Sequence, residues 1–339
     1  MKDVARLAGV SVSTVSAVIN GTSKVTAERT RKIRDAMEAL DYHPDQVARS
    51  LKTGSTNVIG MVIPDVTNQF YSEVVLGVEA AARLANYSVI LCNSNEDPDQ
   101  EQRSLSALRA RRVDGVLISC CNTSRSYDRL QRGNWPVVFF DRIPASVESG
   151  LCTDNQAAAY RGTRHLIELG HRAIAIIAGN VGLSPHAGRL EGFRTAMQEV
   201  GLPVRKEYLR TGAHCVEVGH SFGKELLQLP VPPTAIFATN NKLLLGLVSA
   251  MNEMGVKCPS EVSVVGFDDY AWTQNFYPKL TTVAQPTHEL GRKAMEMLLE
   301  ELRDNGSADA TARRPMVVLE SELRIRQSTA APNGGIHRE

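Results

Sequence analysis

Residues 10–21, VSVSTVSAVING, are almost all β-branched, small or hydroxylated. Such residues form helices poorly, because they lose side-chain freedom or compete for backbone hydrogen bonds. Yet Val15, Val18 and Ile19 have the i, i+3, i+4 spacing of a helical apolar face. Ser11 suits the N-cap position and Gly21 the position after the last turn. The stretch therefore predicts a short helix whose opposite face carries unusually short side chains.

Apolar residues at helical spacing also predict one helix before this stretch and one after it. They are Val4, Leu7 and Ala8, followed by Gly9, and Ile33, Met37 and Leu40, preceded by Thr26 as a possible cap. Two short helices joined by Gly9-Val10-Ser11 make a helix-turn-helix, and the third helix would close its core. We expect a three-helix headpiece over residues 1–43.

Residues 44–56 have the composition of a linker with one short helix, which begins at Pro44 and ends at Gly54. Residues 1–56 carry nine Lys or Arg against six Asp or Glu, so their net charge is +3 and that of the remaining chain is near −2. A small basic unit on a mildly acidic body is typical of a nucleic-acid-binding module, although charge alone equally fits an uneven surface.

From residue 57 onward, apolar runs of strand length alternate with helical patterns. The expected strands are 58–63, 87–92, 114–119, 136–141, 173–179, 234–239 and 262–268, and the expected helices are 70–84, 99–109, 155–169, 188–200, 240–254 and 287–302. This alternation predicts parallel sheets covered by helices on both faces. Its length of roughly 225 residues favours two doubly wound lobes, whose ligand sites lie beyond the carboxyl ends of the strands.

Several function classes find no support in the sequence. The six cysteines show no zinc-ligand spacing, so we expect no metal, and no cofactor is predicted. No signal peptide or membrane-length apolar run is visible, which favours a cytoplasmic protein and argues against a periplasmic receptor. The chain lacks a dinucleotide fingerprint, a P-loop, a nucleophile elbow and the HExxH motif, so an enzyme is not expected.

Seven segments, in order, resemble the lactose/galactose repressor (LacI/GalR) family of bacterial transcription regulators. They are KDVARLAGVSVSTVSAVING, VARSLK, IGMVIPDVTNQFYSEVVLGVE, HLIELGHRAIAIIAG, AGRLEGF, VSVVGFDDY and LTTVAQP. The resemblance implies an α/β fold: a helix-turn-helix headpiece (1–43), a hinge helix and linker (44–56), and a two-lobed core resembling type I periplasmic sugar-binding proteins (57–327). The N-lobe would comprise 57–155 and 284–313, the C-lobe 156–283 and 314–327, and residues 328–339 a disordered tail.

The resemblance also assigns DNA-binding positions in the headpiece. Base-reading positions are Val12, Ser13 and Ala17. Positions nearer the phosphates are Ser11, Thr14, Ser16, Asn20, Lys24, Thr26 and Arg29. Short side chains would let the helix enter the major groove deeply. Because Ala17 stands where family members often have Arg or His, and alanine can only touch a thymine methyl, readout at that base should differ from the common pattern.

In the family, the hinge helix forms on DNA and enters the minor groove beside its two-fold mate. Leu51 would then be the wedge that opens a central base step. Ala48 would permit close helix approach, and Arg49, Ser50 and Lys52 would reach phosphates.

Family effector sites predict a further set of residues in the interlobe cleft: Phe70, Tyr71, Asp141, Arg142, Arg189, His214, Asn240 and Asp268, with Cys120 and Asp154 as weaker candidates. Sugar hydroxyls need paired donors and acceptors in a desolvated site, which carboxylates, Arg and Asn provide. Leu183 and Pro185 replace polar contacts of purine-responsive relatives, His214 replaces a usual aromatic residue, and Asn241 a usual Asp. These departures favour a carbohydrate over a purine.

The sequence therefore predicts a homodimeric repressor of carbohydrate genes that binds a pseudo-palindromic operator and responds to a small sugar-like effector. A global catabolite-type regulator with a phosphoprotein co-effector is the main alternative, since IPDVTNQFY resembles such members, and a purine effector is a further one. The last residues lack the leucine-rich helix of lactose-repressor tetramers, which favours a dimer.

Overall fold

The computed structural model describes residues 1–20, 25–42, 54–123, 127, 130, 135–304 and 315–332, with the backbone alone at Asn20. The chain divides into two compact units, Met1–Thr56 and Asn57–Glu339. Each is described separately below. No helix in the described ranges is long and apolar enough to cross a membrane.

The first unit contains three helices in its described part: α1 (Lys2–Ala8), α2 (Val12–Asn20) and α3 (Ala27–Ala39). Gly9 ends α1 in the left-handed conformation (φ 65°), which glycine adopts without strain. The Ser11 hydroxyl accepts a hydrogen bond from the Thr14 amide at 3.2 Å, as expected of an N-cap. Thr26 precedes α3 without a side-chain cap bond. Residues 21–24 and 43–53, including Gly21, Lys24 and the hinge residues Ala48, Arg49, Ser50, Leu51 and Lys52, lie outside the described residues.

A small apolar core joins these helices. Its buried members are Val4, Ala5, Val15, Ile33 and Ala36, with Val18, Ile19 and Met37 partly buried against them. Leu7 and Leu40, which the apolar spacing placed on inward faces, are 57% and 43% exposed. A unit this small has too little interior to cover every apolar side chain of its helices.

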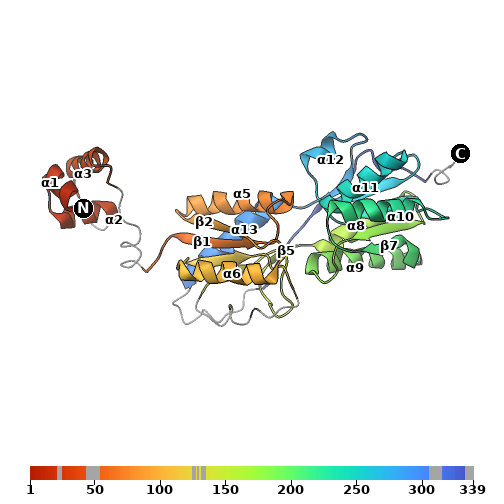
Figure 1. Ribbon diagram of the computed structural model, residues 1–339, viewed down its shortest axis with the longest axis horizontal. Coiled ribbons are helices and arrows are strands. Elements are labelled where there is room, and N and C mark those ends of the chain that lie inside the picture. The colour runs from red at the N-terminus through yellow and green to blue at the C-terminus, as the bar shows by residue number, and fades with distance from the viewer. Residues whose placement is uncertain are drawn as a thin grey trace. The chain divides into compact units, whose positions relative to one another are not determined.

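The second unit has two α/β lobes, which confirms the predicted fold class. The N-lobe has a parallel sheet in the order β2-β1-β3-β4. Its elements are β1 (Val58–Ile63), α5 (Gln69–Leu84), β2 (Ser88–Asn93), α6 (Pro98–Ala110), β3 (Gly115–Ile118), β4 (Val137–Phe139) and α13 (Thr287–Asp304). Helices α5 and α6 lie on opposite faces of this sheet (Figure 1). Alternate residues of β1 face opposite layers, so Met61 packs toward α5 and α13 while Val62 packs toward α6.

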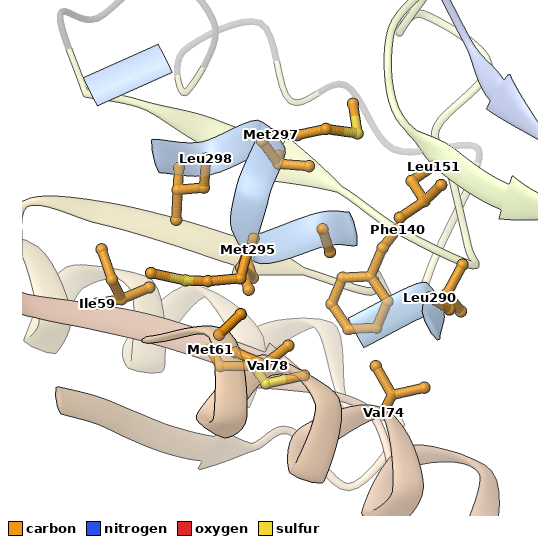
Figure 2. Close-up of a cluster of buried hydrophobic side chains, with 14 of the residues drawn as sticks. Ile59, Met61, Val74, Val78, Phe140, Leu151, Leu290, Met295, Met297 and Leu298 are labelled. Carbon is orange, nitrogen blue, oxygen red and sulfur yellow. The ribbon is translucent and has the colours of Figure 1, made fainter. Parts of the chain in front are cut away.

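The larger N-lobe core lies between the sheet and the helix pair α5 and α13. Figure 2 shows Met61 beside Val78, and Phe140 beside Leu290. The amphipathic face of α13 supplies Leu290, Met295 and Leu298 to this cluster. The last described helix thus completes a lobe whose other helices and sheet strands lie between residues 58 and 139.

The C-lobe has six strands in the order β12-β10-β9-β8-β6-β7, all parallel except the β10–β12 pair. Its elements are α8 (Asn155–Glu168), β6 (Ile174–Ala178), α9 (Ser184–Glu199), a 3₁₀ turn (Lys206–Tyr208), β7 (Leu209–Thr211), α10 (Val216–Leu227), β8 (Ala235–Ala238), α11 (Asn241–Met254), β9 (Ser263–Phe267), α12 (Ala271–Asn275), β10 (Thr281–Ala284) and β12 (Glu322–Arg324). One core lies on the α8 and α9 side of the sheet and another on the α10 and α11 side.

Three passages of the described chain join the lobes: β5 (Leu151–Thr153) into α8, β10 into α13, and β11 (Val317–Leu319) into β12. β5 and β11 pair with each other as a separate parallel ribbon. Asp154 accepts hydrogen bonds from Arg161 at 2.6 Å and from the Ser321 amide at 2.8 Å, which ties two of these passages together.

Residues 328–332 pack on the C-lobe, so the expected disordered tail is wrong for this part. The Ser328 hydroxyl is fully buried and donates to the Val264 carbonyl at 2.6 Å. The Ala330 amide donates to Ser263 and its carbonyl accepts from His171. These backbone bonds order a segment whose composition alone suggested disorder.

Glycines bring paired helices into backbone contact. In the N-lobe, Gly77 of α5 faces the His288 carbonyl of α13, and Gly291 of α13 faces the Val74 carbonyl of α5. In the C-lobe, Gly192 of α9 faces the Gln156 carbonyl of α8 in the same way. A Cβ at any of these positions would overlap backbone atoms, which cannot move as a flexible side chain can.

We predict that Gly291→Ala lowers the free energy of unfolding by about 1–3 kcal/mol, because the added methyl group must separate α13 from α5. Gly162→Ala in α8 is the matched control, since a Cβ there meets only side-chain atoms at 3.3–3.5 Å. Its helix-propensity gain of up to about 1 kcal/mol should offset that crowding. Urea unfolding of both variants checks this; equal stability would show that the helices can separate at little cost.

Candidate functional site

A small cavity lies between the lobes, at the carboxyl ends of their parallel strands. Its volume is about 20 Å³, roughly the space of one water molecule. The structure brings together around it all eight residues that the sequence predicted for the cleft: Phe70, Tyr71, Asp141, Arg142, Arg189, His214, Asn240 and Asp268. That these residues bind an effector stays a prediction.

The topology explains why these residues meet. Each follows a strand of one of the two sheets: Phe70 and Tyr71 open α5 after β1, Asp141 and Arg142 follow β4, Arg189 lies in α9 after β6, His214 precedes α10 after β7, and Asn240 and Asp268 follow β8 and β9. Parallel strands present their carboxyl ends at one edge, and the two lobes turn these edges toward each other.

Two buried aspartates carry the negative charge of the cavity lining. Both have left-handed backbones, with φ of 58° at Asp141 and 78° at Asp268, a costly conformation that concentrates at functional sites. Asp141 accepts a hydrogen bond from the Tyr71 hydroxyl at 2.8 Å, and Asp268 accepts one from Gln285 at 2.6 Å. Burial raises the pKa of both carboxyls, although Arg142 acts to lower the pKa of Asp141 and Arg189 that of Asp268.

Arg189 is the central cation of the cavity. Its side chain donates to Asn155 Oδ1 at 2.8 Å and to the Thr239 carbonyl at 2.7 Å. The guanidinium lies 3.7 Å from the centre of the Phe267 ring, within cation–π range. Burial lowers the pKa of Arg189, while Asp268 and Asp141 act to raise it. Contacts with Asn155, Thr239 and Phe267 thus fix a guanidinium whose ionisation is influenced by an aspartate of each lobe.

Three buried polar atoms around the cavity have no hydrogen-bond partner: Nδ1 of His186, Nδ1 of His214 and the hydroxyl of Tyr270. The two imidazole rings lie 5.1 Å apart. Burial and the nearby Arg189 hold the pKa of His186 well below its usual range, so this imidazole is neutral at pH 7. Buried polar groups are nearly always satisfied, so these atoms are free to bond a water or another polar molecule in the cavity.

Asn68, Pro185, His186 and Gln285 also line the cavity but were not among the predicted site residues. Asn68 caps α5 by accepting from the Phe70 amide at 3.1 Å, so its capping role could have indicated it. Gln285 follows β10, a strand that the sequence did not predict. The weaker candidates Cys120 and Asp154 do not line the cavity: the Cys120 thiol donates to the Arg142 carbonyl behind it.

Contacts between the lobes close the cavity. Lys242 of the C-lobe pairs with Asp65 of the N-lobe at 2.5 Å, and Asn241 donates to Asn68 at 3.1 Å. Thr123 donates to the Gly182 carbonyl at 2.6 Å. The cavity therefore has to widen, by separation of the lobes or movement of its side chains, before it can hold a sugar-sized molecule.

A wider groove of about 780 Å³ adjoins the cavity through Asp141 and Pro185 and runs along β5, α8 and α9. Of the eight predicted effector residues only Asp141 is in its lining, together with the weaker candidate Asp154. The convergent charged groups lie in the smaller cavity, which is therefore the better candidate site. No group of three or more His, Cys, Asp or Glu side chains in the described parts of the chain could hold a metal ion.

The headpiece presents the short-side-chained face of α2 to solvent. Val12 is 41% exposed, and the hydroxyls of Ser11, Ser13 and Thr14 form a network at 2.7 and 2.8 Å. Ser16 and Ala17 are partly exposed, whereas Val15 is fully buried in the core. Thr26 and Arg29 are exposed at the start of α3. This exposed face, without bulky or acidic side chains, suits entry into a DNA groove.

A helix-turn-helix unit joined to a two-lobed ligand-binding core defines a DNA-binding transcription regulator. Residues 1–45 match the model of bacterial regulatory proteins of the lacI family, and residues 56–319 match that of periplasmic binding proteins and the sugar-binding domain of the LacI family. The chain therefore belongs to the LacI family.

Relatives in this family have different names. The chain is 39% identical over 331 residues to the HTH-type transcriptional repressor PurR of Actinobacillus pleuropneumoniae serotype 3 (strain JL03), covering 97% of each. It is 39% identical over 305 residues to the ribose operon repressor of Escherichia coli (strain K12), covering 89% of this chain and 92% of the relative. The lac repressor dimer bound to operator and the anti-inducer ONPF superposes with a TM-score of 0.87 at 26% identity, covering 97% of this chain and 98% of that one.

Adjacent aspartates should have opposite effects on stability. The pKa of Asp268 is higher in the folded protein than in the unfolded chain, where it is about 3.9. The free energy of unfolding therefore falls as the pH rises from 3.9 toward the pKa of the folded state. Asp268→Asn removes this ionisation and should stabilise the protein at pH 7.5. Asp269 pairs with Arg324 and Arg326 at 2.6 and 2.7 Å, and hydrogen bonds from these arginines lower its pKa in spite of burial. The ionised Asp269 therefore adds to the free energy of unfolding above pH 3.9, and this contribution is lost as the pH falls below that value.

Asp269→Asn should therefore cost about 3 kcal/mol at pH 7.5, the lower end for a broken buried ion pair, since the Arg324 side chain is 44% exposed. Urea unfolding at pH 4.5 and 7.5 checks both variants. The difference between Asp268→Asn and the natural protein should shrink at pH 4.5, whereas that of Asp269→Asn should stay nearly the same, because the Asp269 contribution is lost only below about pH 3.9. An Asp268→Asn protein less stable than the natural one at pH 7.5 would show that this carboxylate is needed for folding.

Proposed function

We propose that this repressor binds a pseudo-palindromic operator as a homodimer and that an uncharged sugar-like molecule in the interlobe cavity sets its operator affinity. The observation that carries the effector proposal is the joint placement of Asp141, Arg189, Asn240 and Asp268 at the strand ends of both lobes. Vicinal hydroxyls of a sugar both donate and accept, and they match carboxylate acceptors beside guanidinium and amide donors.

A purine effector is the second candidate, because a relative that is 39% identical is named PurR. The cavity lining supports a sugar better. Phe70 and Tyr71 are in edge contact, with ring planes at 85°, and the opposite wall has the imidazoles of His186 and His214 rather than an aromatic hydrocarbon ring. A flat base would leave the aspartates on either side with few ring donors to accept from.

The effector can act only through different affinities for the two arrangements of the lobes. A molecule that pairs with Asp141 of the N-lobe and with Arg189 and Asp268 of the C-lobe binds best when the lobes are closed, so it shifts the population toward that arrangement. A coupling of about 1–3 kcal/mol to operator binding is typical of such systems. A protein that binds operator DNA in this way acts in the cytoplasm.

The effector proposal is tested by thermal shift and calorimetry with D-ribose, other free sugars, hypoxanthine and guanine. A sugar at 100 times its Kd should stabilise the protein by about 2.7 kcal/mol. Asp268→Asn should weaken that sugar by about tenfold or more, the loss of a charge-assisted hydrogen bond. Asp269→Asn, the neighbouring control, should keep the natural affinity. Binding of a purine base and of no sugar would contradict the proposal.

The DNA-binding proposal is tested by selecting genomic fragments with the full-length protein and measuring affinity against salt. The selected sites should be pseudo-palindromes, because a two-fold dimer reads two half-sites. With about six phosphate contacts, affinity should fall by roughly 10³ between 50 and 200 mM salt. A salt slope near zero would refute operator binding through the basic headpiece and hinge.

A further inference from the structure

Glu96 brings a carboxylate to the edge of the interlobe cavity. It lies between β2 and α6 of the N-lobe, where Asn95 and Glu96 both have left-handed backbones, with φ of 54° and 60°. The Glu96 amide donates to the Pro64 carbonyl at 3.0 Å, which holds this turn against the end of β1. Two consecutive residues in this conformation carry a cost that the surrounding contacts must offset.

The Glu96 carboxylate pairs with Arg142 at both of its oxygens. Nη1 and Nη2 of Arg142 donate to Oε2 and Oε1 at 2.6 and 2.9 Å, a bidentate arrangement. Nε2 of His214, from the C-lobe, lies 3.0 Å from Oε1. The Arg142 side chain is 4% exposed and that of Glu96 is 34% exposed. The Glu96 carboxylate therefore occupies donors on both terminal nitrogens of the buried Arg142 guanidinium.

Glu96 stays ionised. Burial alone would raise its pKa, but hydrogen bonds from His214 and Arg142, together with the charge of Arg142, lower the pKa to about 2. The carboxylates of Glu96, Asp141 and Asp268 thus face the two guanidinium groups of Arg142 and Arg189, while His186 is neutral.

This pairing bears on which ligands the cavity accepts. A phosphate or carboxylate group would seek the donors of Arg142, and it would meet the Glu96 carboxylate already on them. The other cation, Arg189, is held by Asn155 and the Thr239 carbonyl, and the charges of Asp268 and Asp141 are near enough to raise its pKa. A hydroxyl group, in contrast, can donate to the aspartates and accept from guanidinium or imidazole N–H groups without any charge being displaced.

We propose that Glu96 is a specificity-determining residue that excludes phosphorylated and carboxylated molecules, so that the cavity accepts uncharged polyhydroxyl ligands. Its carboxylate occupies the N–H donors of Arg142 that an anionic ligand would use. The same negative charge repels a phosphate or carboxylate group that approaches them. The inference rests on the proposed function, since it assumes that the interlobe cavity is the effector site.

The test compares D-ribose, D-ribose 5-phosphate and inorganic phosphate on the full-length protein by calorimetry and thermal shift. The natural protein should bind ribose at least about a hundredfold more tightly than ribose 5-phosphate and show no response to phosphate. Glu96→Gln should improve the affinity for ribose 5-phosphate relative to ribose by about tenfold or more and should become sensitive to phosphate, because it frees Arg142 from a charged partner.

Two further variants separate charge from structure. Glu96→Asp keeps the negative charge and should keep the exclusion. Glu191→Gln makes the same change at a side chain of α9 that is 56% exposed, and it should behave like the natural protein. Thermal unfolding of each ligand-free variant shows whether it is folded, and Glu96→Ala repeats the test with no side chain left to contact Arg142.

The outcomes distinguish the inference from the proposed function. Equal binding of ribose and ribose 5-phosphate by the natural protein, or an unchanged ratio in both Glu96→Gln and Glu96→Ala, overturns the role of Glu96 and leaves a sugar effector in place. If the natural protein binds no sugar, the effector proposal fails; the role of Glu96 then stands if Glu96→Gln responds to phosphate and falls if it does not.

Discussion

The core unit depends on polar and charged groups of its two lobes meeting around a small buried cavity. Arg189 of the C-lobe and Asp141 of the N-lobe are 4% and 6% exposed, and each influences the ionisation of the other. Each also has a stronger charge partner in its own lobe, Arg142 for Asp141 and Asp268 for Arg189, so the charges across the cavity add to a balance that exists within each lobe. The lobes are joined by short passages of chain, and their closed arrangement is held by direct contacts such as Lys242 with Asp65 and His214 with Glu96. A molecule that supplies its own hydrogen bonds at the same place can compete for these groups, which is how a small ligand could alter a large unit.

The DNA-facing part of the protein follows a different physical rule. In α2 the apolar residues face a core so small that Leu7 and Leu40 remain exposed nearby, and the opposite face carries hydroxyls and methyl groups. Little stability is available to this unit from burial alone. The sequence of α2 instead favours a narrow helix surface, because short side chains allow a closer approach to the DNA groove than long ones would. The two units thus make opposite use of their polar residues, since the core buries and pairs them while the headpiece leaves them open to solvent.

Much of this architecture could be predicted from the sequence, because long buried strands and amphipathic helices leave strong patterns. β1, for example, spans Val58–Ile63 as expected, and the residues after β4, β8 and β9 fall into one cavity. The short strands β5, β7, β10, β11 and β12 were not predicted, although β3, β4 and β8 of similar length were. β5 and β11, for example, pair with each other across more than 160 residues of chain. α10 was missed as well, because the glycines that let it approach α11 weaken its helical pattern. Glu96 could not be found from the sequence, because its significance depends on the position of Arg142, 46 residues further on.

The glycine contacts between paired helices have a consequence for how such a protein can change over evolutionary time. Where α5 meets α13, and α8 meets α9, main chain touches main chain, so the spacing of these helices is insensitive to most substitutions elsewhere on their surfaces. The ligand-contacting residues lie instead on the connections that follow the strands. Recognition can therefore diverge at these connections while the scaffold stays constant, and descendants of one ancestor can acquire new signals without a new fold.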